Sequence, residues 1–138
     1  MPAPRPVPPV ALAAVLAVAV QLWGLYRAGG PPDPTPVPGL DKVAHAVVFA
    51  VPLWLVLRAA AAWTGRRPAP RTVGVVVAVF AGHAVLSEVL QHLLYTWRTG
   101  DPYDVLADLL GVAAGLVLAR RFDGVRSPGP AAAARGTR

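Results

Sequence analysis

Apolar residues fall into four long runs, at about residues 10–26, 43–63, 72–94 and 105–119, separated by shorter polar or proline-rich stretches. A helix needs about 20 residues to cross the ~30 Å hydrocarbon core of a bilayer. The first three runs reach this length, and the fourth does so only if its helix begins among the acids at 101–104. The pattern predicts an all-α, polytopic membrane protein, a bundle of four transmembrane helices.

The fourth run carries a polar stripe. Asp101, Asp104 and Asp108 lead into it at spacings of three and four, and Gly111 and Gly115 continue the series. Residues at these spacings share one face of a helix. Because carboxylates are costly in lipid, we expect this face to pack against other helices. The two glycines predict a close helix–helix contact of the small-xxx-small kind.

Composition agrees with a membrane protein: 55% of the 138 residues are hydrophobic and 14% are charged, which is less charge than a soluble domain normally carries. We predict a four-helix domain at 10–119 between disordered tails at 1–9 and 120–138. The first run has no clear cleavage site after it, which favours a retained span over a signal peptide. Cysteine is absent, which excludes disulfides and thiolate nucleophiles.

The basic residues predict the orientation. Arginines gather between the second and third runs and after the fourth, whereas the other two connections carry few basic residues. Cytoplasmic loops hold the excess of Lys and Arg, so both termini are predicted to be cytoplasmic and the loops at 27–42 and 95–104 to face outward. The net charge of +6 then reflects topology and attraction to anionic membrane lipids. We expect no nucleic-acid partner, because no stacking-aromatic pattern accompanies these arginines.

Unusual polar residues lie at the predicted outer ends of three helices. Because isolated charges are expensive inside a membrane, we expect them to converge and line a shared cavity. We take His45, Glu88 and Asp104 as a candidate catalytic acid–base cluster. The candidate binding residues around it are Asp41, Lys42, Gln91, Arg98, Asp101 and Asp108.

These residues carry a family resemblance. "DKVAH" at 41–45, "SEVLQ" at 87–91, an arginine in the following loop and "DVLADLLGVAAG" at 104–115 together resemble the VanZ-like family of small bacterial membrane proteins. The family's functional positions fall on Asp41, Lys42, His45, Glu88, Gln91, Arg98 and Asp104, with its paired glycines on Gly111 and Gly115. Asp108 departs from the pattern, since the family usually has Asn there.

The resemblance implies a multi-pass protein of the bacterial cell membrane with a role in the cell envelope. The family takes its name from a protein linked to low-level teicoplanin resistance. One hypothesis is therefore an outer-leaflet site for a lipid-linked or peptidoglycan-related compound. Lys42 and Arg98 would hold its phosphate or carboxylate, while Glu88 and His45 exchange protons with it.

The sequence limits the chemistry of such a site. No nucleophile is evident. Ser87 is the neighbour of Glu88 in sequence, so its side chain is turned about 100° away around the helix, which argues against a Ser-Glu-His relay. His45, Glu88, Asp104 and Asp108 include suitable metal-ligand types, but their spacing matches no recognised motif, so we assign no metal.

Two other functions stay open. The first is a non-enzymatic helper, whose polar cluster clamps the helices together or binds a glycopeptide, a lipid or a partner protein. The second is a proton-coupled carrier using Glu88, His45 and His83, which is disfavoured because four short helices leave little room for alternating access. An open pocket among the polar residues favours the binding site, and mutually paired side chains favour the clamp.

The predicted orientation can be tested with single cysteines, since the chain has none. Cysteines replacing Thr35 or Thr99 should react with a membrane-impermeant thiol reagent in intact cells. Cysteines replacing Gly65 or Ser127 should react only after the cells are opened. The reverse labelling pattern would refute both the orientation and the outer-leaflet position of the polar residues.

Overall fold

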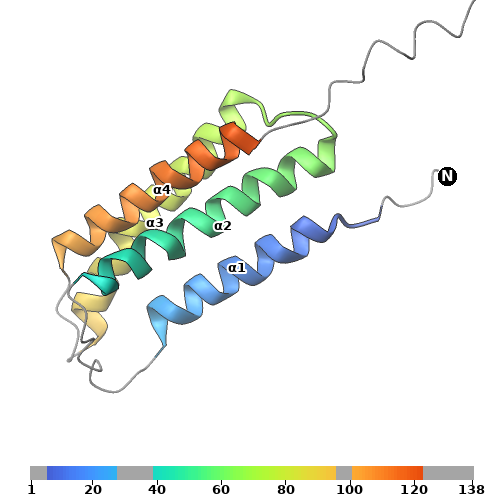
Figure 1. The fold of residues 1–138 in the computed structure, drawn as a ribbon. Helices are drawn as coiled ribbons and strands as arrows, with labels where there is room; N and C mark the ends of the chain where they lie inside the picture. Colours follow the sequence, from blue (N-terminus) through green and yellow to red (C-terminus); the bar gives the residue numbers. More distant parts are fainter. Residues whose placement is uncertain (1–5, 28–38, 96–100, 123–138) are drawn as a thin grey trace, which may run out of the picture.

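The structure is a computed structural model, and it describes residues 6–27, 39–95 and 101–122. These residues form four helices and no strand (Figure 1): α1 Pro9–Tyr26, α2 Leu40–Thr64, α3 Pro70–Leu94 and α4 Pro102–Phe122. All four are long and apolar enough to cross a membrane. The predicted all-α fold of four candidate membrane spans is confirmed.

Proline and glycine set several helix ends. α1 and α3 begin at Pro9 and Pro70, where proline costs little because the first N–H groups of a helix have no partner inside it. α2 lies between Gly39 and Gly65, whose φ angles are 81° and 66°. Glycine adopts this left-handed conformation without steric cost. α2 itself continues through Pro52, as membrane helices allow when neighbours satisfy the freed carbonyl.

α4 begins among the acids at 101–104, as predicted from the short length of the fourth apolar run. The helix begins at Pro102, and the carboxylate of Asp101 accepts a hydrogen bond of 2.8 Å from the backbone N–H of Tyr103, which caps the helix. α4 ends at Phe122, past the predicted boundary at 119, because arginines in a last turn suit the negative end of the helix dipole. The rest of the predicted C-terminal tail, and residues 1–5 of the N-terminal one, lie outside the described residues.

α2 is the central helix of the bundle. It contacts α1, α3 and α4, whereas α1 packs mainly on α2 (Figure 1). The buried core is built around Phe49, Leu53 and Leu57 of α2, with Phe80 of α3 and Val112 of α4 against them. Many large apolar side chains point outward instead, as expected for helices whose outer surface meets lipid.

The glycine stripe of α4 faces α2. A Cβ atom added at Gly111 would collide with the backbone of Ala46, and one added at Gly115 would lie 2.5 Å from the carbonyl oxygen of Ala50. The predicted small-xxx-small contact is confirmed. Asp108, one turn earlier on the same stripe, is fully buried.

The two ends of the bundle differ in chemistry. The start of α1, the α2–α3 connection and the end of α4 lie at one end (Figure 1), and this end carries the arginines at 66, 67, 71, 120 and 121. The predicted site residues that the structure describes lie at the opposite end. This separation agrees with the orientation predicted from the arginines, which stays a prediction.

Replacing Gly111 with Ala should destabilise the bundle, because the new methyl group would push α4 away from the backbone of α2. Overpacking of this kind typically costs ~1–3 kcal/mol. Gly82→Ala is the matched control, since nothing lies within 4 Å of its Cβ position and Ala favours a helix by about 1 kcal/mol over Gly. Thermal unfolding in detergent should give a lower melting temperature for the first variant only. Equal melting temperatures would contradict the close approach.

Candidate functional site

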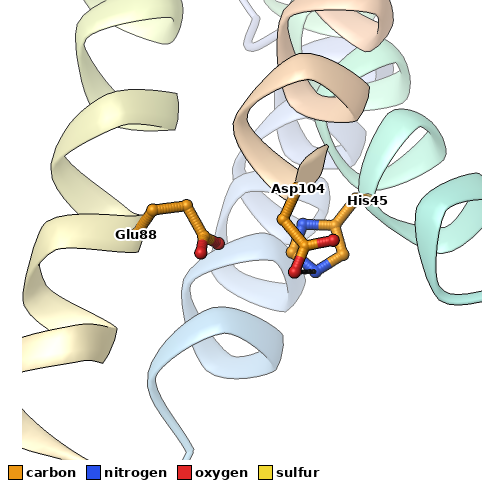
Figure 2. A group of neighbouring side chains, drawn as sticks. All are labelled: His45, Glu88 and Asp104. Carbon is orange, nitrogen blue, oxygen red and sulfur yellow. Dashed lines mark ion pairs between the residues drawn. The ribbon is translucent and has the colours of Figure 1, made fainter. Parts of the chain in front are cut away.

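The candidate site lies where one end of α2, α3 and α4 meet. His45 comes from the first turns of α2, Glu88 from the last turns of α3 and Asp104 from the first turn of α4. Figure 2 shows the three side chains pointing toward one another. One candidate ligand atom from each lies within 4.8 Å of the other two. The structure therefore brings together the three residues that the sequence assigned to an acid–base cluster.

Lys42 is the main positive charge of this region. Its Nζ atom lies 2.6 Å from Asp101, 2.5 Å from Asp104 and 3.1 Å from Asp41. The ion pairs to Asp101 and Asp104 tie the start of α2 to the start of α4. The Lys42 ammonium, together with the Tyr103 N–H, holds the pKa of the Asp101 carboxyl below its ordinary value.

His45 is held by the buried acid of the stripe. Its Nδ1 atom lies 2.9 Å from Oδ1 of Asp108, and its Nε2 atom lies 3.8 Å from Oδ2 of Asp104. The shorter contact is a hydrogen bond, and the longer one is not. A proton on Nδ1 donated to Asp108 leaves Nε2 directed toward Asp104.

Glu88 connects α3 to the start of α4. Its side chain is only 5% exposed, and Oε2 accepts a 3.2 Å hydrogen bond from the backbone N–H of Asp101. Among the described residues, the buried Oε1 atom has no hydrogen-bond partner. Gln91, one turn further along α3, is also buried, and its Nε2 atom is unpaired within the same part of the chain.

The described part of the cluster is strongly acidic. Five carboxyl groups surround one ammonium and one imidazole: Asp41, Glu88, Asp101, Asp104 and Asp108 around Lys42 and His45. Lys42 is already engaged by three of these acids. An arrangement with this charge attracts cationic or hydrogen-bond-donating groups more readily than a bare phosphate.

A cavity of about 550 Å³ borders this cluster. Trp23, Leu25 and Arg27 of α1 form one side, and Asp41, His45 and Val48 of α2 form the other. A second cavity of about 290 Å³ continues along the α1–α2 seam, shares Val48, and is otherwise lined almost entirely by apolar side chains such as Leu16 and Val51. We call these two cavities the α1–α2 groove.

Sequence analysis missed the part that α1 plays in the groove. Arg27 lies 5.3 Å from the centre of the Trp23 ring, which is a cation–π contact, and both residues line the cavity beside His45. The available signal was a lone arginine at the predicted outer end of the first helix. By itself, an arginine at a helix end indicates only topology.

Other predicted polar residues lie apart from the cluster. His83 pairs with the Tyr26 hydroxyl at 3.1 Å and lies beside the Phe49 ring. Ser87 donates to the carbonyl oxygen of Ala84 within its own helix, in agreement with its exclusion as a nucleophile. His92 is exposed. Arg98, which the sequence assigned to anion binding, lies outside the described residues.

Fold and candidate site together define a class: a small helical membrane protein with an acidic, histidine-containing cluster shared by the ends of three helices. The family model described as VanZ/LLP1 matches residues 9–123. The chain belongs to this family, as the resemblance implied. Neither the comparison with curated proteins nor the comparison with solved structures gives a match.

Removing the charge of Lys42 should destabilise the protein most at neutral pH. Lys42 lowers the pKa of the Asp101 carboxyl in the folded protein. The ion pair therefore stabilises the folded state fully above the unfolded-state pKa of about 4. This stabilisation is lost as the pH falls through the lower folded-state pKa. The melting temperature of Lys42→Met should be below that of the wild type at pH 7, and the gap should narrow on acidification below about pH 4. Lys42→Arg is the charge-preserving control. A gap independent of pH would contradict the ion pairs.

Proposed function

We propose that the protein binds a lipid-linked compound of the bacterial cell envelope in the outer leaflet of the cell membrane. The observation that carries this proposal is the α1–α2 groove, which runs from apolar side chains to the acidic cluster along a single helix seam. A ligand with an apolar chain and a polar head group matches this change in chemistry. Binding sites for small molecules commonly combine an apolar wall with a few convergent polar groups.

The apolar half of the groove suits a hydrocarbon chain. Leu16 and Val20 of α1 face Val47 and Val51 of α2 across it. Three of these side chains are more than half exposed and Val51 is 38% exposed, so the groove is open toward the surroundings of the bundle. A chain could therefore enter sideways from the lipid without the helices separating.

The polar half suits a head group with an anionic part and hydroxyl or amino groups. Arg27 replaces Lys42 as our candidate for the anionic part, because Lys42 is already bound to three carboxylates. A guanidinium group matches phosphate and carboxylate geometry well. The carboxylates of the cluster accept hydrogen bonds from hydroxyl and amino groups of the ligand.

An envelope ligand of this kind connects the proposal to glycopeptide susceptibility. Teicoplanin acts outside the cell. A protein that binds or processes an envelope compound in the outer leaflet would change how much of that compound is exposed to the drug. We therefore propose that altered teicoplanin tolerance is a cellular readout of this site.

A purely structural clamp is the second candidate function, and one observation favours it. Lys42 joins α2 to α4, and Glu88 joins α3 to α4, so the cluster holds three helices together. The groove argues for ligand binding, because a clamp alone requires no cavity beside His45.

Filling the groove tests binding against clamping. Gly24 lines the cavity, and nothing lies within 4 Å of its Cβ position, so Gly24→Leu should occupy the groove without disturbing the ion pairs. The variant should fold and accumulate normally, yet lose envelope compounds that co-purify with the wild type, as measured by mass spectrometry. Teicoplanin tolerance should change in parallel.

Gly82→Leu is the matched control, since Gly82 has equal space around its Cβ position on α3, away from the groove. This variant should retain both the bound compounds and the tolerance of the wild type. If Gly24→Leu kept the same bound compounds and tolerance as the wild type, the groove would not be the binding site, and the clamp would be the better account of the cluster.

A further inference from the structure

We propose that His45, Glu88 and Asp104 bind one divalent transition-metal ion of the Zn²⁺ or Mn²⁺ type. Imidazole and carboxylate groups are common ligands of these ions. The three residues come from three different helices, so they form no metal-ligand motif along the sequence. The site is recognised from the structure, in which one candidate ligand atom of each residue lies within 4.8 Å of the others (Figure 2).

Each of the three side chains has one atom held by the protein. Asp108 holds Nδ1 of His45, Lys42 holds Oδ1 of Asp104, and the backbone N–H of Asp101 holds Oε2 of Glu88. In the described part of the chain, the other atom of each side chain makes no hydrogen bond and can serve as a ligand: Nε2 of His45, Oδ2 of Asp104 and Oε1 of Glu88. Pre-oriented ligands of this kind are typical of protein metal sites.

The contact of His45 with Asp108 is the most informative of these. Histidines that bind metals usually donate their second ring N–H to a carboxylate or carbonyl, which fixes the tautomer and raises the basicity of the ligating nitrogen. Asp108 is completely buried and lies 2.9 Å from Nδ1. It is a positioning residue, which directs Nε2 of His45 toward Asp104.

Glu88 supplies evidence that is independent of the acidic charge. Its side chain is more than nine-tenths buried, and Oε1 has no hydrogen-bond partner in the described part of the chain. Figure 2 shows this carboxyl group directed toward Asp104 and His45. A buried acceptor is costly without a partner, and a cation between the three side chains supplies one.

The distances leave space for an ion. Two donor atoms that each lie ~2.0–2.2 Å from one metal ion are about 3–4 Å apart. Nε2 of His45 and Oδ2 of Asp104 are separated by 3.8 Å, within this range and too far for a direct hydrogen bond. A carboxylate oxygen of Glu88, which lies within 4.8 Å of the other two ligand atoms, would complete a three-ligand site with further positions open to a ligand.

An ion here also accounts for how an acidic cluster receives an anionic head group. The cation would offset the excess of carboxylates and offer open coordination positions to a phosphate or carboxylate. This role in ligand binding rests on the proposed function. The binding of the ion itself does not, because it depends only on the three side chains.

Metal binding can be measured without any lipid. The protein, purified in detergent with a histidine-free tag and stripped with a chelator, should bind one Zn²⁺ per chain in isothermal titration calorimetry. Glu88→Gln, Asp104→Asn and His45→Gln should each weaken binding by more than the ~10–100-fold that loss of an outer-shell partner typically costs. Asp108→Asn should fall within that range, because an amide oxygen still accepts the His45 N–H without its charge.

His92→Gln is the matched control for His45→Gln, since it makes the same change in an exposed histidine of α3 and should leave the affinity unchanged. A second measurement needs no folded variant: pulsed EPR of Mn²⁺ bound to the wild type should detect coupling to an imidazole nitrogen. Absence of saturable Zn²⁺ binding, absence of nitrogen coupling, or equal weakening by His92→Gln would overturn the proposal. Gly24→Leu should still bind Zn²⁺, so failure of the metal site and failure of the groove are separate results.

Discussion

The close approach of α2 and α4 is the constraint on which the rest of the structure depends. Gly111 and Gly115 allow the backbone of α4 to lie directly against Ala46 and Ala50 of α2, a distance that a side chain on either glycine would prevent. In a membrane, lipid tails solvate apolar side chains as well as a neighbouring helix does. Helices therefore gain stability from tight packing and not from the hydrophobic effect. The same contact fixes the register that brings Asp108 to His45, and Lys42 to the first turn of α4.

The acidic cluster follows from this register, and its charge balance determines what it can bind. Lys42 satisfies Asp101 and Asp104, and His45 satisfies one oxygen of Asp108, but Glu88 and Asp108 each retain a buried oxygen without a partner among the described residues. Helix association alone would be served equally well by fully paired groups. The incomplete pairing is a stronger indication of a ligand than the number of acids.

Family membership and site chemistry contribute separately to the functional argument. The VanZ/LLP1 match over residues 9–123 identifies the kind of membrane protein, but a family does not define a reaction. The proposal of a lipid-linked ligand instead depends on α1, whose Trp23 and Arg27 complete the wall of the groove beside His45. α1 thus supplies one apolar wall of the groove beside the cluster.

The sequence by itself determined the four spans, the start of α4 among its acids, and the face on which Asp108, Gly111 and Gly115 lie. These properties depend on hydropathy and on the 3.6-residue helical period, which are local. Tertiary structure alone decided that Lys42 is engaged in ion pairs and that Arg27 lines the groove. It also decided that one buried oxygen of Glu88 has no hydrogen-bond partner among the described residues. Each of these depends on the rotation and depth of one helix against another, which packing sets and which no spacing along a single helix encodes.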